Sequence, residues 1–396
     1  MNNINGKILF SCPTVFLKRP IAEIISKMDK NKIGLLSPVD IVDGALSIHY
    51  NKFNTINFHH YHTLQLPISS EWPIPINPVK ILNILTRIRD YEIIHMWVPF
   101  YLTHVFIILL KKILYPRKKL IITMDTFPGL SFKTGIISNF LFKLFYNLIA
   151  KFFFKNVDYL VLYSDSFKQF ALDIGIEEKK IKILPTGVST NLEEKTMNIR
   201  KEFNIDSDDK IILFVGLLNH RKGVDIFIKI ADKLREREDI RFLIVGDGAD
   251  AAKYKEMVKE RNLTDKIIFT GYRKDVQNFY YESDILLLPS RGEGLSGVLM
   301  ESMSYGLPIV SSNIVGTVDL VENNYNGFLC EINDLDCYVK KILSLLDDKK
   351  LRETFIENSV EKINKNFDWK NNIKKYKRFY KKINNKSYSD RDIPLK

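Results

Sequence analysis

Short runs of apolar residues alternate with longer amphipathic stretches along the chain. The apolar runs are three to five residues long, which suits buried strands, and the stretches between them have the spacing of helices. Strands that alternate with helices are typical of parallel α/β sheets. The predicted strands are Lys7–Phe10, Glu92–His95, Leu120–Thr123, Tyr159–Leu162, Ile211–Val215, Arg241–Val245, Ile267–Phe269, Ile285–Leu288 and Ile309–Ser311.

A polar, turn-rich segment from Leu184 to Asp209 divides this pattern in two. The chain has 396 residues, which is enough for two domains of ordinary size. We therefore predict a first domain over residues 1–190 and a second over residues 191–365. Ligands of open α/β sheets bind beyond the carboxyl ends of the strands, so two such sheets would face each other across a cleft.

Two stretches of the first domain are unusually apolar, Met96–Leu110 and Ile136–Phe154. Pro99 interrupts the first, and Lys143 and Lys151 interrupt the second. Neither stretch reaches the roughly 20 apolar residues that a membrane-spanning helix needs. Both fit core helices, and the second also fits an interfacial helix whose lysines extend past Phe and Tyr rings toward headgroups.

Two glutamates eight positions apart, Glu293 and Glu301, are the most informative candidates for chemistry. The strand Ile285–Leu288 precedes them, and a helix is predicted from Gly297 to Tyr305, where Gly306 stops it. One carboxylate therefore lies in a strand-to-helix loop and the other about two turns into the helix. The rise of an α-helix separates them by roughly 10–12 Å.

This separation matches the span of a sugar–diphosphate–ribose unit. The helix N-terminus between the two carboxylates would face the diphosphate, because free N–H groups and the helix dipole favour anions. Glu301 could accept hydrogen bonds from a ribose diol, and Glu293 from a sugar hydroxyl. The arrangement therefore predicts a nucleotide-sugar site.

Two cations, Arg221 and Lys222, lie between the strand Ile211–Val215 and the predicted helix Val224–Arg235. The start of a helix is unfavourable for cations unless an anion is bound there. A guanidinium fork beside an ammonium suits a diphosphate. The alternative interpretation is solvated surface charge.

Gly246–Ala251 matches the pattern G-x-G-x-x-A after a strand, which is also found in dinucleotide-binding folds. The match is weak, because it lies in the second half of the chain and Asp247 falls inside the loop. We do not expect a redox cofactor.

Candidate metal ligands are few. His59, His60 and His62 have no partner carboxylate at ligand spacing, and the pairs Asp206/Asp208 and Asp334/Asp336 lie where turns or helix caps explain them. We expect no metal. Cys12, Cys330 and Cys337 are too few and too scattered for a disulfide framework or a zinc site, and they suggest a reducing, cytosolic setting. The N-terminus does not read as a signal peptide.

The net charge of +12 is unevenly distributed. Residues 1–185 carry 23 Lys/Arg and 13 Asp/Glu, residues 361–396 carry 12 and 4, and the segment between carries 24 and 30. A basic face toward anionic lipid and a merely lysine-rich composition both explain the excess. Nucleic acid is not expected as a partner, since no such motif is present and the site-bearing segment is net acidic.

A series of short motifs follows in order over about residues 205–335. They are Phe214–Gly216, Arg221–Gly223, Ile244–Gly248, Phe269–Tyr272, Ser283–Ile285, Leu288–Ser290, Glu293–Gly294, Glu301–Met303, Gly306–Val310 and Asn326–Phe328. Together they resemble glycosyltransferase family 4, whose members are retaining enzymes of the GT-B architecture. The resemblance implies two Rossmann-like α/β/α domains facing a central cleft, with a basic C-terminal helix over residues 366–396 that returns to the first domain.

The resemblance implies roles for several residues. Lys222, helped by Arg221, would bind the donor diphosphate, Glu301 would hold the ribose, and Glu293 would hold the donor sugar. The full set of implied donor-binding residues is Arg221, Lys222, Tyr272, Arg273, Glu293, Gly294, Leu295, Ser296 and Glu301.

Within that set, the backbone amides of Leu295 and Ser296, after Gly294, would contact phosphate or sugar. Tyr272 and Arg273 would lie beside the nucleotide base. The donor would be a UDP- or GDP-linked sugar.

Three positions depart from the family pattern. Leu217 stands where the family often has arginine, and Lys18 or Arg19 would replace the amides of a glycine-rich first loop. Asp125 stands where a histidine usually lies near the reacting sugar. Its carboxylate could stabilise oxocarbenium character or simply bind a sugar hydroxyl, and Phe127–Phe132 would border the acceptor. The predicted catalytic residues are Asp125, Glu293 and Lys222.

The implied activity is metal-independent transfer of a sugar to a hydroxyl, with retention, onto a glycan or lipid-linked acceptor of the cell envelope. The protein would be cytoplasmic, with a possible peripheral site on an anionic membrane surface. A nucleotide-sugar 2-epimerase of the same architecture and a non-catalytic nucleotide-sugar-binding partner remain alternatives.

Overall fold

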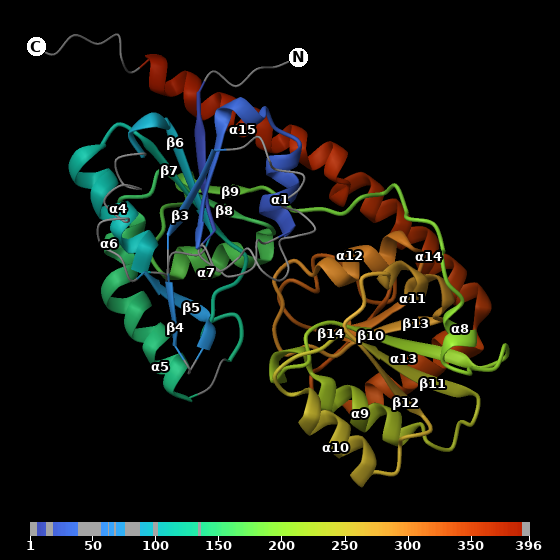
Figure 1. The fold of residues 1–396 in the computed structure, drawn as a ribbon. Coiled ribbons are helices and arrows are strands. Elements are labelled where there is room, and N and C mark those ends of the chain that lie inside the picture. Colours follow the sequence, from blue (N-terminus) through green and yellow to red (C-terminus); the bar gives the residue numbers. More distant parts are fainter. Residues whose placement is uncertain are drawn as a thin grey trace, which may run out of the picture.

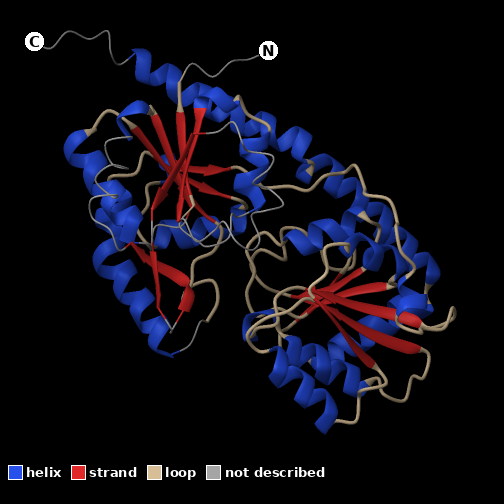
Figure 2. Cartoon of the chain, viewed as in Figure 1, coloured by secondary structure: helices blue, strands red, loops and turns tan. Residues whose placement is uncertain are grey.

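The computed structural model describes residues 6–12, 19–38, 57–61, 63–66, 69–75, 88–97, 102–133 and 136–389. Figure 1 shows two parallel sheets, each covered by helices, and Figure 2 shows their strands in red between blue helices. All nine predicted strands are present, each within two residues of its expected ends. The predicted α/β architecture is confirmed.

The first sheet has seven parallel strands. In spatial order they are β3 (Asn57–Tyr61), β2 (Ile33–Pro38), β1 (Ile8–Ser11), β6 (Ile93–Trp97), β7 (Lys119–Met124), β8 (Tyr159–Leu162) and β9 (Ile181–Ile183). Successive side chains point to opposite faces, so Leu120 and Ile122 enter one core while Ile121 enters the other. A separate antiparallel hairpin consists of β4 (Thr63–Leu66) and β5 (Ser69–Pro75).

Helices cover both faces of this sheet. One face packs against α4 (Leu102–Leu114), the π-helix η4 (Phe145–Ala150), which continues α5 (Ile136–Leu144), and then α6 (Lys151–Lys155) and α7 (Lys168–Asp173). The other face packs against α1 (Arg19–Ser26) and α15 (Trp369–Ser389).

The second sheet has six parallel strands. In spatial order they are β12 (Ile267–Gly271), β11 (Ile240–Val245), β10 (Lys210–Val215), β13 (Ile285–Leu288), β14 (Ile309–Ser312) and β15 (Phe328–Cys330). Its helices are α8 (Ile199–Glu202), α9 (Val224–Lys233), α10 (Ala251–Glu260), α11 (Val276–Glu282), α12 (Gly297–Ser304), α13 (Leu335–Asp347) and α14 (Lys349–Lys362).

The chain returns to the first domain after α14, as predicted. Val188 N–H donates to the Phe367 carbonyl at 2.9 Å, which joins the outgoing and returning segments. Helix α15 then lies along the first domain (Figure 1), where the Tyr376 hydroxyl donates to the Leu184 carbonyl at 2.8 Å. The Tyr380 hydroxyl forms a 2.7 Å hydrogen bond with Nδ1 of the buried His95.

The structure bears on two expectations that rest on composition. In the described part of the chain, no helix is long and apolar enough to cross a membrane. The cysteines are predicted to be too scattered for a disulfide framework and to indicate a reducing setting. One pair, Cys330 and Cys337, nevertheless forms a disulfide with a Cα–Cα distance of 5.9 Å, so the cysteines do not support that setting. Cys330 ends β15 and Cys337 lies in the first turn of α13, so a short connection brings them together.

Candidate active site

The loops after β10 and β13 approach each other closely at the carboxyl ends of the second sheet. These two strands pair in parallel, and the 3-10 helix η7 (His220–Lys222) follows β10. Gly223 ends η7 with φ 72°, and a Cβ there would overlap the Pro289 carbonyl oxygen. Glycine is therefore required by both its φ angle and its packing, and this places the predicted cations against Glu293.

Glu293 and Lys222 form an ion pair inside this loop cluster. The Lys222 ammonium donates to Glu293 Oε1 at 2.8 Å and to Oε2 at 3.0 Å, and the Ser290 hydroxyl donates to Oε1 at 2.6 Å. Burial by itself would raise the pKa of Glu293, but Lys222, Arg221 and the two hydrogen-bond donors together lower it below the usual range. The carboxylate is therefore ionised and held in one orientation.

Arg221 lies beside this pair and extends toward the first domain. Its Nη1 donates to the Gly292 carbonyl at 2.8 Å and lies 3.9 Å from Glu293 Oε2. Its guanidinium carbon is 5.8 Å from the ring centroid of Phe132, which belongs to the first domain. About a third of the Arg221 side chain is exposed, so it can also reach an anion.

Glu301 lies in α12, as predicted, and Gly306 follows the helix with φ 72°. The Tyr280 hydroxyl, which comes from α11, donates to Glu301 Oε2 at 2.9 Å. The Tyr280 ring stacks on Tyr305 with centroids 5.3 Å apart. A packed tyrosine therefore orients one oxygen of the carboxylate.

The N-terminus of α12 lies between the two glutamates in sequence. Leu295 and Ser296 are buried, and the Ser296 hydroxyl has no hydrogen-bond partner among the described residues. A buried hydroxyl without a partner is uncommon. Together with the first N–H groups of the helix, it provides donors of the kind that bind a phosphate or sugar oxygen.

Asp125 of the first domain reaches the same loop. It directly follows β7, and a Cβ added to Gly294 would lie 2.7 Å from the Asp125 carbonyl oxygen. A Cβ added to Gly292 would likewise lie 2.5 Å from Cβ of Phe132. The structure thus brings Asp125 and Phe132 next to the segment that carries Glu293.

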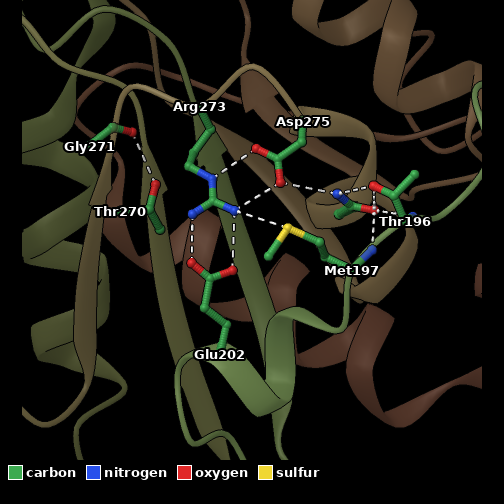
Figure 3. Close-up of polar contacts among 8 residues, drawn as sticks. Thr196, Met197, Glu202, Thr270, Gly271, Arg273 and Asp275 are labelled. Carbon is green, nitrogen blue, oxygen red and sulfur yellow. Dashed lines mark hydrogen bonds and ion pairs between the residues drawn. The ribbon is translucent and has the colours of Figure 1, made fainter.

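Tyr272 and Arg273 follow β12, but their side chains differ in availability. Tyr272 is 69% exposed. Arg273 is held by Asp275 and Glu202 in two bidentate ion pairs, with N···O distances from 2.6 to 3.1 Å (Figure 3). Asp275 and then Glu202 raise the pKa of Arg273, and Arg273 lowers the pKa of Asp275 to about 2. Arg273 thereby joins α8 to the loop after β12. A base contact here would therefore use Tyr272 or the backbone.

The motif Gly246–Ala251 is accounted for by packing. Gly246 has φ 140°, and a Cβ there would overlap the Gly216 carbonyl oxygen. A Cβ on Gly248 would lie 2.6 Å from the Leu218 carbonyl oxygen. The two glycines let the loop after β11 pack on the loop after β10.

Within the described residues, no three His, Cys, Asp or Glu side chains converge on one point. His59 and His60 lie in β3, whereas His62 and Lys18 lie outside the described residues. Arg19 begins α1. Asp334 caps α13 by accepting from Cys337 N–H at 3.0 Å, as the capping interpretation predicts.

Two residues of the site were not expected from the sequence. Ser290 bonds to Glu293, and Tyr280 bonds to Glu301. Ser290 is three positions before Glu293 in the loop after β13, and that spacing could have indicated it. Nothing in the spacing of Tyr280, which is 21 positions before Glu301, indicates their contact.

Comparisons with known proteins agree with this geometry. A family described as "Glycosyl transferases group 1" matches residues 195–362. An uncharacterised glycosyltransferase of Methanocaldococcus jannaschii, MJ1069, is 30% identical over 84% of this chain and 86% of its own. The Escherichia coli UDP-Gal:alpha-D-GlcNAc-diphosphoundecaprenol alpha-1,3-galactosyltransferase is 29% identical over 60% of this chain and 64% of its own.

Solved structures share the fold. Anabaena Alr3699/HepE, solved in complex with UDP and glucose, matches with a TM-score of 0.78 at 15% identity, over 95% of this chain and 99% of that chain. A sucrose-phosphate synthase of Thermosynechococcus elongatus matches with a TM-score of 0.73 at 16% identity, over 96% and 99%. The extent of the match to the methanogen protein, together with the family match over the site, shows that this chain is a glycosyltransferase of the glycosyl transferases group 1 family.

Proposed function

We propose that this glycosyltransferase moves one sugar from a UDP- or GDP-linked donor to a hydroxyl of a glycan or lipid-linked acceptor, with retention of configuration. The observation that carries the proposal is the buried ion pair of Lys222 and Glu293 beside the N-terminus of α12. It combines a cation for a diphosphate and an oriented carboxylate for a sugar in one place.

The proposed roles follow from this geometry. Arg221, Lys222 and the α12 N–H groups would stabilise the charge on the departing diphosphate, which would take the acceptor proton. Glu293 would hold the donor sugar, and Glu301, oriented by Tyr280, would bind the ribose. No step in this scheme needs a metal ion.

Asp125 would act from the opposite side, from the first domain. Its main chain lies against Gly294, next to Glu293 in sequence, and this supports a role near the sugar that Glu293 would hold. There it would stabilise positive charge at the anomeric carbon or bind a sugar hydroxyl. Contact between the loops after β7 and β13 would also exclude water and so limit donor hydrolysis.

The name of the Escherichia coli relative specifies a diphosphoundecaprenol acceptor, and two other relatives are named as O-antigen biosynthesis glycosyltransferases. The first name supports a lipid-linked acceptor, and the other two support a role in cell-envelope polysaccharide synthesis. We place the protein in the cytoplasm, with peripheral contact to the inner face of the membrane.

The test is transfer by the purified chain. Incubation with a panel of UDP- and GDP-sugars and short lipid diphosphate sugars should yield a product whose anomeric proton coupling matches that of the donor, with or without EDTA. A product of inverted configuration would refute retention, and loss of activity in EDTA would refute metal independence. Isomerised donor formed without acceptor would instead indicate an epimerase.

A further inference from the structure

One side of the first domain exposes an unusual number of large apolar side chains. It is formed by α4, α5 and η4. Of the fifteen large apolar or aromatic side chains that are exposed within the described residues, seven lie on these helices. They are Phe106, Ile113, Leu114, Phe140, Leu141, Leu144 and Leu148, which are 40–72% exposed, and we call them the apolar face.

The apolar face is additional to the side of these helices that packs on the sheet. Ile107 and Ile108 of α4 and Tyr146 and Ala150 of η4 are buried in one core with the first sheet. These helices therefore have an inner apolar side that the fold covers and an outer one that nothing in the described residues covers. Packing among the described residues accounts for the inner side only.

Basic residues predominate in the segment that carries the apolar face. Residues 98–157 contain nine Lys/Arg and a single acidic residue, Asp125. Lys112 of α4, Lys143 of α5 and Lys155 of α6 are exposed, whereas Lys111 is mostly buried and pairs with Asp158 at 3.2 Å. Exposed lysines beside Phe and Leu side chains are typical of a surface that rests on anionic headgroups with its apolar residues in the acyl boundary.

Helix α15 provides an internal comparison. It is also basic, and Lys374 and Lys375 are exposed, but its apolar residues, such as Tyr376 and Ile383, are buried against the first domain. It has charge without an exposed apolar face. Electrostatic attraction alone would draw α15 and the apolar face to a membrane equally. Insertion into a bilayer requires exposed apolar side chains, and of the two only the apolar face has them among the described residues.

We propose that the apolar face and its flanking lysines dock this protein on a membrane surface that carries anionic lipid. The partner is a bilayer, because a second protein copy with the same positive charge would be repelled at this surface. The proposal deepens the proposed function and rests on it for the lipid-linked acceptor.

The position of this surface suits a lipid-linked acceptor. The loop after β7 packs on α5, since a Cβ added to Gly129 would lie 2.9 Å from Cβ of Phe142. The same loop reaches the donor segment, where Phe132 lies against Gly292. One short loop therefore connects the docking surface to the candidate active site.

The test is co-sedimentation of the purified chain with vesicles of phosphatidylcholine alone and with phosphatidylglycerol added. We expect binding only with the anionic lipid, weakened by salt. The variant Leu141→Gln/Leu148→Gln should bind the anionic vesicles about tenfold or more weakly, and Lys112→Glu/Lys143→Glu similarly. All four side chains are exposed, so thermal unfolding should not change.

Matched controls separate this surface from general charge and from catalysis. Leu192→Gln/Tyr325→Gln removes exposed apolar side chains elsewhere, and Lys374→Glu/Lys375→Glu makes the same charge change on α15. Both should retain vesicle binding. The proposal would be overturned if the α15 variant lost vesicle binding to the same extent. It would also be overturned if light scattering showed a dimer that Leu141→Gln/Leu148→Gln abolishes. Binding of UDP is measured in a separate assay. If the active-site assignment is wrong, the vesicle-binding result can therefore still be interpreted.

Discussion

The loop after β13 in the second domain and the loop after β7 in the first approach the same place from opposite sides. Glu293 is oriented within its own domain, by Lys222 and Ser290. Asp125, by contrast, comes next to Gly294 only because the two domains touch. The difference suggests that donor binding depends on the second domain alone, whereas transfer depends on both.

The largest effect should come from Glu293→Gln. It preserves the shape but removes the charge that pairs with Lys222, so we expect kcat/KM to fall by about 100–1,000-fold. Steady-state transfer assays would measure this. The exposed Glu357→Gln on α14 serves as the control and should keep full activity.

Asp125→Asn should separate the two domains' contributions. Its charge would act only near the transition state, so kcat should fall by about 10–100-fold while UDP affinity stays within about twofold. Calorimetric titration of UDP alongside the transfer assay would measure both. Normal turnover would show that Asp125 is not catalytic, and lost UDP affinity would show that the domains do not act separately.

Glu301→Ala tests the second domain's donor site. Loss of a charged hydrogen bond to the ribose should weaken UDP binding by about 1–3 kcal/mol. The same titration would show it, and the 2′-deoxy form of UDP should be much less sensitive to the substitution. Unchanged UDP affinity would refute the ribose role.

Acid should also reduce the stability of the two domains over different pH ranges. Burial lowers the pKa of His95 to about 3, so the native state stays neutral while the unfolded chain binds a proton below its usual pKa of 6.5. The contribution of His95 to the free energy of unfolding is therefore fully present above pH 6.5 and is lost as pH falls toward 3. Between pH 6.5 and 5.5 the loss is about 1 kcal/mol. Glu293, whose pKa is lowered from 4.5, loses its contribution only as pH falls below that value.

This pH effect can be followed in the first domain, because all three tryptophans lie outside residues 191–365. Urea unfolding monitored by tryptophan fluorescence should lose less stability between pH 6.5 and 5.5 in His95→Gln than in the parent. The exposed His220→Gln should match the parent. An identical pH dependence in His95→Gln would refute this explanation.

The smallest effect is expected for Tyr280→Phe. It removes the hydrogen bond that orients Glu301 but keeps the ring that stacks on Tyr305. UDP affinity and the KM for the donor should change by about three- to fivefold, with kcat preserved. In a Glu301→Ala background the substitution should have no further effect, and an additive loss would show that Tyr280 acts elsewhere.

The sequence alone determined the local elements of this protein. Strand and helix spacing depend on residues that are close in the chain, so the nine strands, the helix of Glu301 and its stop at Gly306 could be predicted. The family motifs also lie mostly within single loops, which is why Glu293, Lys222 and Arg221 could be named.

Only the tertiary structure decided which of these groups meet. The contact of Lys222 with Glu293 joins residues 71 positions apart, and Arg273 is paired with Glu202 across the same separation. Spacing identifies apolar residues, but whether another element covers them depends on packing between distant segments. For that reason the exposure of Phe140 and Leu148, and the position of Asp125 against Gly294, could not be read from the chain.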